Sequence, residues 1–299
     1  MAEASMIKTM FHLDTAPTIP LSLTDIPLQA QAMVGKMSIS GVQPKLSLRL
    51  DKAKKELIPV AAGGEYILKP QIQQFPHIPE NETCCMDIAA ALDIEVPPHC
   101  LLPLNDGTLA YVVKRFDRVG AKKIHQENFY QILEKRDKYA GSLEEIGRKL
   151  KEISAVPGLD VQLFFERVVL DFLIGNGDGH FQNYSISYRD DGVRLAPAYD
   201  LVSTKLVIPR EEDSALTLNG KRNKLTRGDF DAFADALGIP VRVRYEKFIG
   251  ALGRIRPLVD ASSLPPKFRA QFIEIVQSRS QRLAIDADDA KPSVHPKAA

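Results

Sequence analysis

Residues 176–183 read Asn-Gly-Asp-Gly-His-Phe-Gln-Asn, and Asp200 follows seventeen positions later in Ala-Tyr-Asp-Leu-Val-Ser. Asp178 and Asn183 lie five positions apart in the first of these stretches. Mg²⁺ is a hard ion that keeps most of its waters and takes one or two protein carboxylates together with phosphate oxygens. Asn183 and Asp200 suit that need, and Asp178 remains as a carboxylate that can accept a proton. The two stretches therefore indicate a site for phosphate chemistry.

The same residue types also gather in ordinary surface turns, and an Asp followed five positions later by an Asn is common by chance. The flanking sequence favours a built site. Residues 160–174 are strongly apolar and predict a helix with Asp160 as its N-cap, which delivers the polar stretch at its C-terminal end. Residues 184–187 and 193–196 alternate as in a short hairpin. The five-residue interval is similar to that of protein-kinase catalytic loops, so a phosphotransfer loop and a plain turn are the two interpretations that stay open.

Length and composition permit an enzyme of ordinary size. The chain has 299 residues and 44% apolar content, which is enough for two domains or one large two-lobed domain. Its 39 basic and 38 acidic side chains give a net charge of +1, so no global attraction to nucleic acid or an anionic membrane is expected. No apolar run approaches the roughly 18 residues of a membrane span, and the N-terminus lacks the pattern of a signal peptide. We therefore expect a cytoplasmic protein with no membrane partner.

The three cysteines, Cys84, Cys85 and Cys100, form neither a disulfide framework nor a zinc spacing. We expect them to be reduced residues of the core.

The order of predicted elements divides the chain near Asp117. Up to that point strands are expected at 46–50, 57–60, 66–69, 99–103 and 109–115, with one helix at 81–92. Beyond Phe116 the pattern predicts helices at 127–133, 142–153, 160–174, 229–237, 241–252 and 266–283. The first thirty or so residues carry little pattern and are expected to lie as a leader on the body. The prediction is an α+β fold with a small β-rich N-terminal lobe (1–117), an all-helical C-terminal lobe (118–285) and a disordered tail (286–299).

Three features of the first lobe suit a nucleotide site. Residues 38–45 are turn-forming and precede a strand, so their backbone N–H groups could surround phosphates, although a generic turn has the same composition. Lys69 ends a strand and could offer an ammonium to phosphates, although most such lysines are merely solvated. Glu82 lies at the start of a helix, where a carboxylate favours the helix dipole in any case, and it could also pair with Lys69.

Six segments occur in an order that is not generic. They are Ser-Ile-Ser-Gly-Val-Gln-Pro-Lys (38–45), Tyr-Ile-Leu-Lys-Pro (66–70), Glu-Asn-Glu (80–82), Val-Lys-Arg-Phe-Asp-Arg (113–118), the stretch 176–183 and Tyr-Asp-Leu-Val-Ser (199–203). Over about 38–203 the chain resembles the HipA family of bacterial serine/threonine kinase toxins, which implies a two-lobed, protein-kinase-like fold that uses ATP and Mg²⁺. The short stretch before residue 38 resembles HipT, the kinase of three-component HipBST toxin–antitoxin systems.

The resemblance assigns roles to the candidate residues. Asp178 matches the catalytic aspartate, Asn183 and Asp200 match the magnesium ligands, and Lys69 matches the lysine on the nucleotide phosphates, with Glu82 as its ion-pair candidate. The other nucleotide-binding candidates are the backbone of Lys114 and Phe116 at the adenine, Gln131 near the ribose, Ser40, Gly41 and Val42 in the phosphate loop, and His180 in the catalytic loop.

Ser38 and Ser40 match serines that family members autophosphorylate. A phosphate there would add nearly two negative charges where the phosphates of ATP would lie, so it should oppose nucleotide binding or reorder the loop. Turn-stabilising hydroxyls are the alternative interpretation of both serines.

The resemblance further implies a toxin whose target is an aminoacyl-tRNA synthetase and whose partners are HipS-like and HipB-like antitoxins, with no nucleic-acid contact outside a repressor complex. One departure bears on activity: Gln182 stands where many family members have a lysine, so another cation such as Lys45 or Lys69 would have to compensate. A non-catalytic kinase-like partner in a repressor complex and a small-molecule kinase stay open as alternatives.

Overall fold

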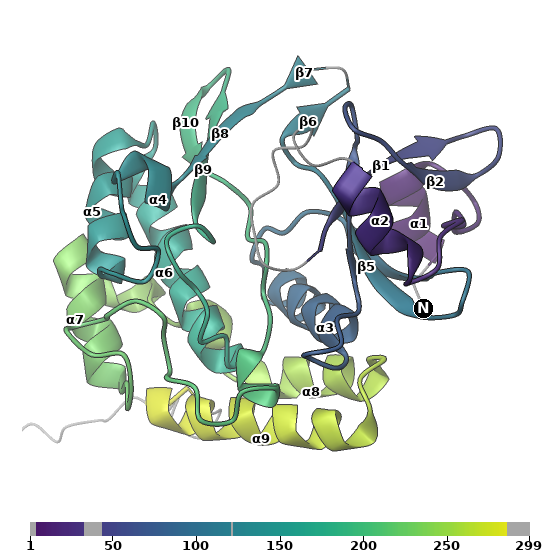
Figure 1. Cartoon of the computed structure of the whole chain (residues 1–299). Coiled ribbons are helices and arrows are strands. Elements are labelled where there is room, and N and C mark those ends of the chain that lie inside the picture. Colours follow the sequence, from purple (N-terminus) through teal and green to yellow (C-terminus); the bar gives the residue numbers. More distant parts are fainter. Residues whose placement is uncertain (1–3, 33–43, 121, 286–299) are drawn as a thin grey trace, which may run out of the picture.

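The computed structural model describes residues 4–32, 44–120 and 122–285 (Figure 1). The predictions for Ser38, Ser40, Gly41 and Val42, and for the tail 286–299, lie outside these residues. Figure 1 shows the five-stranded sheet in one part of the molecule and most of the helices in the other.

The sheet has five antiparallel strands in the order β2-β1-β3-β5-β4. They are β1 (Leu46–Asp51), β2 (Glu56–Pro59), β3 (Tyr66–Pro70), β4 (His99–Pro103) and β5 (Leu109–Lys114). Alternate side chains of a strand share a face, and β1 accordingly buries Leu46, Leu48 and Leu50. The strands predicted for this part of the chain are confirmed. Helix α3 (Ile78–Ala91) is confirmed too, although it begins three residues before the predicted start.

The N-terminal segment contains helices that the sequence pattern did not predict. It contains α1 (Ala4–Phe11) and α2 (Asp25–Ala32), and α1 buries Ile7, Met10 and Phe11 in the same apolar cluster as side chains from one face of the sheet. An eight-residue helix spans barely two turns, which is too short for hydrophobic periodicity to reveal.

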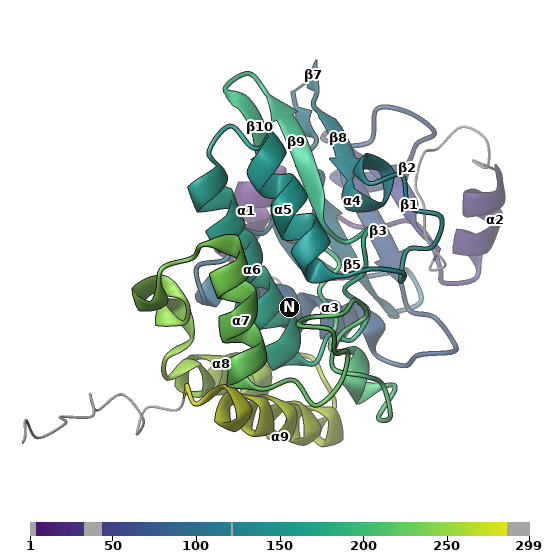
Figure 2. The ribbon, with the colours of Figure 1, turned by 90° about the vertical axis from the view of Figure 1, so that its left-hand side faces the viewer.

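The second part of the chain is built around α6 (Pro157–Ile174), whose side chains are buried from Phe164 to its end. The remaining helices are α4 (Phe129–Ile132), α5 (Leu143–Ile153), α7 (Arg227–Leu237), α8 (Ala251–Ala261) and α9 (Pro266–Leu283), with 3₁₀ turns η1 (Thr204–Leu206), η2 (Val241–Val243) and η3 (Glu246–Phe248). Figure 2 shows α5, α6 and α7 grouped together, with α9 running beneath them. Among the described residues, no helix is both long and apolar enough to cross a membrane.

The expectation of an all-helical second lobe is wrong. Strands β8 (His125–Asn128), β9 (Ser185–Arg189) and β10 (Gly192–Leu195) form a three-stranded antiparallel sheet, and β6 (Arg118–Val119) pairs with β7 (Lys122–Lys123). The predicted hairpin is confirmed in β9 and β10. Glu127, which was expected in a helix, pairs with Ile186 instead. A partner so distant in sequence leaves no local pattern, so the strand could be mistaken for the first turn of α4.

Two further details differ from the predictions. Helix α6 begins at Pro157, a residue suited to the first turn, so Asp160 is not its N-cap but a buried acid paired with Arg194 at 3.0 Å. The helix expected over 241–252 is two 3₁₀ turns, and Gly250, at φ 67°, precedes α8.

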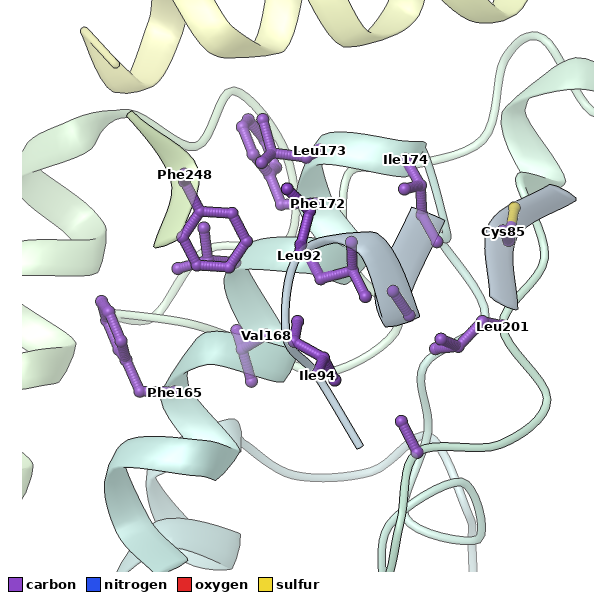
Figure 3. Packing of buried hydrophobic residues seen from close by; sticks show 14 of the residues in the cluster. Cys85, Leu92, Ile94, Phe165, Val168, Phe172, Leu173, Ile174, Leu201 and Phe248 are labelled. Carbon is purple, nitrogen blue, oxygen red and sulfur yellow. The ribbon is translucent and has the colours of Figure 1, made fainter. Parts of the chain in front are cut away.

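The two parts share one apolar core (Figure 3). Leu92 and Ile94, which follow α3, lie beside Val168 and Phe172 of α6. Burying each such side chain contributes about 1.5–3 kcal/mol, so this core fixes α3 relative to α6 and to the loop that follows α6. Cys84, Cys85 and Cys100 are free and buried, as expected, and burial raises the pKa of Cys84 and Cys100 to about 12.

Candidate active site

A cleft of about 1520 Å³ is lined by residues of the five-stranded sheet, of α3 and of the loops that follow α6 and β10. The residues with predicted chemical roles that face it are Lys69, Glu82, Asp178, Asn183 and Asp200. Segments far apart in sequence thus bring together the groups that the motifs singled out. Lys114, Phe116, Gln131 and His180 line the same cleft.

Lys69 is the central cation of the cleft. It lies in β3, is buried, and its Nζ contacts Glu82 Oε1 of α3 at 2.6 Å and Asp200 Oδ1 at 2.5 Å. Burial by itself would lower the pKa of Lys69, but the charges of Asp200 and Glu82 outweigh it and hold the pKa above its usual value. Burial would likewise raise the pKa of Asp200, yet Lys69 holds it well below the usual range. The predicted pairing of Lys69 with Glu82 is confirmed, and Asp200 joins it.

Asp200 and Asn183 lie within one hydrogen bond of each other. Asn183 Nδ2 donates to Asp200 Oδ2 at 3.0 Å, while Asn183 Oδ1 accepts from the His180 N–H at 3.1 Å. Asp200 has φ 60°, a left-handed conformation that is uncommon outside glycine and is enriched at functional sites.

The pair fits a divalent cation held by few protein ligands. If the Asn183 amide is flipped, it and the Asp200 carboxylate can offer two oxygen ligands to one cation. Phosphate and water oxygens would supply the other ligands. Within the described part of the chain no group of three or more His, Cys, Asp or Glu side chains is arranged for a metal ion.

Asp178 is presented by a loop that α6 holds in place. The helix ends at Gly175, whose φ of 79° allows the left-handed C-cap that turns the chain into the loop. Asn176 Oδ1 then accepts from the Asp178 N–H at 3.2 Å, and Asn176 Nδ2 donates to buried Asp171 at 2.7 Å. The Asp178 side chain is 48% exposed and lines the cleft.

The residues predicted to contact adenine and ribose already make contacts within the protein. The Lys114 N–H donates to Pro98 O at 2.8 Å and is therefore not available to an adenine in this state. Phe116 stacks on Tyr199, with ring centroids 5.7 Å apart. Gln131 Oε1 accepts from the Asn128 N–H at 3.1 Å in the capping box of α4. Contacts of these residues with a nucleotide stay predictions.

Several residues of the site escaped sequence analysis. Tyr139 Oη donates to Asp178 Oδ1 at 2.8 Å, and Lys138 Nζ lies 2.8 Å from His180 Nε2. Thr204 Oγ1 accepts from the Gly177 N–H at 2.7 Å and donates to Glu211, which also lines the cleft. All four side chains come from segments without hydrophobic periodicity, and their proximity to the loop is a product of the fold.

Asn81 connects the two sides of the cleft. Its Nδ2 donates to Ser203 O at 3.0 Å and its Oδ1 accepts from the Ser203 N–H at 2.9 Å. Helix α3 therefore holds both Glu82 and the segment that carries Asp200. The Glu-Asn-Glu segment singled out in the sequence contains this residue, so its middle position is structural.

Comparison with known proteins identifies the family and the fold. The family model of the HipA-like C-terminal domain matches residues 37–256. Y4mE of Sinorhizobium fredii, which is named only as a candidate kinase, is 32% identical over 271 residues that cover 84% of this chain and 62% of the relative. The chain thus spans less than two thirds of that relative.

Two solved structures share the fold. HipA of Shewanella oneidensis, in a toxin–antitoxin complex with HipB and operator DNA, has a TM-score of 0.69 at 22% identity and covers 85% of this chain and 66% of its own. The Helicobacter pylori kinase CtkA has a TM-score of 0.60 at 16% identity and covers 89% of this chain and 95% of its own. At these identities the likeness concerns the fold alone, which is that of HipA and CtkA. Because the family model matches well over half of its residues, this chain belongs to the HipA-like family.

Proposed function

We propose that this protein is an ATP- and Mg²⁺-dependent protein serine/threonine kinase that acts as the toxin of a toxin–antitoxin system. The observation that carries the proposal is the convergence of Lys69, Asp178, Asn183 and Asp200 in one cleft. A phosphotransferase needs a cation for phosphates, oxygen ligands for Mg²⁺ and a carboxylate for the acceptor hydroxyl. Membership of the HipA-like family and the kinase-like fold support this assignment.

In this proposal each residue of the cleft has one chemical role. Asp178 accepts the proton of the substrate hydroxyl. The oxygen of that hydroxyl forms a bond to the γ-phosphorus of ATP, while the bond between the γ-phosphorus and the β–γ bridging oxygen breaks and ADP leaves. Lys69 and residues 38–45 hold the phosphates of ATP, and Asn183 and Asp200 would hold Mg²⁺. The metal supplies neutralisation of the phosphate charge. Ser38 and Ser40 are the proposed sites of autophosphorylation, which would limit activity.

The partners are proposed by analogy. The HipA structure that this chain resembles is bound to HipB and operator DNA. We propose a HipB-like antitoxin and, on the sequence resemblance to HipT, a HipS-like protein as partners in the cytoplasm. The proposed substrate is an aminoacyl-tRNA synthetase, whose phosphorylation would stall translation.

The proposal is tested in cells. Expression of the wild-type chain should arrest growth. It should also raise the abundance of one or a few phosphoserine or phosphothreonine peptides, and at least one of them should come from an aminoacyl-tRNA synthetase. The Asp178→Asn variant, expressed to the same level, should do neither. Equal growth arrest with both proteins would contradict the kinase proposal and favour a non-catalytic partner. Phosphopeptides from another protein class would keep the kinase and reject the synthetase.

A further inference from the structure

The segment 134–141 packs directly on the loop that carries Asp178. The Phe181 N–H donates to Lys138 O at 3.3 Å, and Arg222 Nη2 donates to Tyr139 O at 2.6 Å. A Cβ on Gly141 would lie 2.6 Å from the Phe181 ring, so only glycine permits this approach. The backbone of Lys138 and Tyr139 is therefore fixed relative to the Asp178 loop, and both side chains line the cleft.

Tyr139 holds one oxygen of the Asp178 carboxylate. Its hydroxyl donates to Oδ1 at 2.8 Å, and its ring packs edge-on against His180 with centroids 5.2 Å apart. Burial, together with the bond to Asp178, raises the pKa of Tyr139, so the hydroxyl keeps its proton and remains a donor. With Oδ1 occupied in this way, Oδ2 is the oxygen left to accept a proton from a substrate.

Lys138 lies beside a histidine that cannot accept hydrogen bonds on both ring nitrogens while it is neutral. Its Nζ is 2.8 Å from His180 Nε2, while His180 Nδ1 faces the Gln182 N–H at 3.3 Å. A neutral imidazole has one acceptor nitrogen, and a backbone N–H can only donate. The two contacts therefore compete for one acceptor: either the Lys138 ammonium or the Gln182 N–H faces a ring nitrogen that carries a hydrogen. In both cases at least two of the three donors of the ammonium can still bind an anion in the cleft.

The charge balance of the cleft favours the same conclusion. Lys45, Lys69 and Lys138 all line it. Lys69 is held by Glu82 and Asp200. Within the described residues, the ammonium of Lys138 contacts His180 and lies 4.8 Å from the centroid of the Tyr139 ring. A bound phosphate group would offset the positive charge of Lys138.

From this geometry we infer that Lys138 is a second phosphate-binding cation, one that contacts the phosphoryl group during transfer, and that Tyr139 is a positioning residue that aims Asp178. The inference rests on the proposed kinase function. It also accounts for the neutral Gln182, because Lys138 supplies from a neighbouring segment the charge that position 182 lacks. As the bond between the acceptor oxygen and the γ-phosphorus forms and the bond to ADP breaks, the ammonium offsets the negative charge on the equatorial oxygens.

Steady-state phosphotransfer by the full chain tests the inference with Lys138→Met, Lys138→Arg and Tyr139→Phe, using ATP, Mg²⁺ and any phosphoacceptor that the wild type modifies. Lys138→Met should lower kcat by about 100-fold with a smaller change in KM for ATP, as expected for the loss of a donor to developing charge. Lys138→Arg should recover most of kcat. Tyr139→Phe should lower kcat by roughly tenfold and leave KM for ATP unchanged.

Lys135→Met is the matched control. Lys135 belongs to the same segment and lies 4.7 Å over the Phe181 ring, but it pairs with Glu145 and does not line the cleft. Its removal should leave kcat at the wild-type value. Lys138→Gln serves as a second neutral variant in case the methionine protein does not fold, which thermal unfolding monitors.

The possible results distinguish failure of the inference about Lys138 from failure of the proposed kinase function. If the wild type is active and the kcat of Lys138→Met, or of Lys138→Gln, stays within about twofold of the wild-type value, the inference is overturned. The kinase proposal would then remain intact. Equal losses in the arginine and methionine variants would overturn it too, because charge would then not be the requirement. A wild type that transfers no phosphate under conditions in which it binds ATP would reject the proposed function, and the inference with it.

Discussion

The Nζ of Lys69 lies 2.5 Å from Oδ1 of Asp200, although 131 positions separate the two residues in the chain. The contact joins strand β3 to the segment that follows β10 and so spans the cleft. Asp200 is also a predicted ligand of Mg²⁺, and Lys69 is the predicted partner of the nucleotide phosphates. In the proposed function a phosphate and its metal would compete for both groups, and this competition would couple nucleotide binding to the geometry of the cleft.

Removal of the Lys69 charge should destabilise the fold. Lys69→Met leaves the buried carboxylate of Glu82 without its cation, and breaking a buried pair in this way costs about 3–5 kcal/mol. The free energy of unfolding in urea measures the loss. The double variant Lys69→Met/Glu82→Gln should recover part of it, because no uncompensated charge then stays buried at position 82. A single variant as stable as the wild type would show that the pair is not buried as described.

Asn81 should matter for stability more than its polar character suggests. Asn81→Ala removes both hydrogen bonds to the Ser203 backbone and leaves a buried N–H and a buried C=O unsatisfied, with an expected loss of about 2–4 kcal/mol. Thr83→Ala on the same helix is the matched control. Its hydroxyl donates to Pro79 O within the same helix, so a loss of about 1 kcal/mol or less is expected. Equal losses in the two variants would contradict the bridging role of Asn81.

Asp171 should make stability depend on pH between about 4 and 6. Burial raises the pKa of this carboxyl to about 6 in the folded state, although Tyr184 and Asn176 donate hydrogen bonds to it. The unfolded value is near 3.9, so between these two values the folded state binds more protons than the unfolded state. The contribution of Asp171 to the free energy of unfolding is thus fully present below about pH 4 and is lost as the pH rises through about 6.

Asp171→Asn removes this dependence. The difference in unfolding free energy between wild type and variant should change by an amount on the order of 2–3 kcal/mol over that pH range, falling as the pH rises. Asp191→Asn, in the exposed turn between β9 and β10, controls for the loss of one charge. A pH-independent difference would show that Asp171 does not titrate in this window.

Aspartate at both Ser38 and Ser40 should weaken ATP binding. Two added charges near the proposed phosphate site repel the nucleotide, and about tenfold is expected from a repulsion of roughly 1.4 kcal/mol. Calorimetric titration with ATP and Mg²⁺ measures the effect, and the double Ser→Asn variant controls for the loss of the hydroxyls. Unchanged affinity in the aspartate variant would reduce the two serines to turn residues.

The sequence predicted the five strands of the first sheet and the helices 142–153, 229–237 and 266–283 to within a few residues, because each has a clear local period or cap. It failed at β8, where the partner strand comes more than fifty positions later, and at 241–252, where a glycine divides the apolar residues. The N-terminal helix α1 escaped because it is short. Local pattern could reveal none of these features.

The site divides in the same way. Asp178, Asn183, Asp200, Lys69 and Glu82 could be predicted, since each belongs to a motif whose spacing or order is informative, and the structure brings all five together. Lys138 and Tyr139 could not be predicted, because no pattern in residues 134–141 indicates a contact with a loop forty positions away. Only the folded chain places their side chains beside Asp178.

The measurement that tests the central claim most directly is intact-mass spectrometry of purified wild type and Asp178→Asn after incubation with ATP and Mg²⁺, with ATP binding to both proteins confirmed by calorimetry. The account predicts one or two added phosphates on the wild type, mapped to Ser38 or Ser40, and none on the variant although it still binds ATP. Equal phosphorylation of the two proteins would contradict the role of Asp178 as the base that accepts the substrate proton.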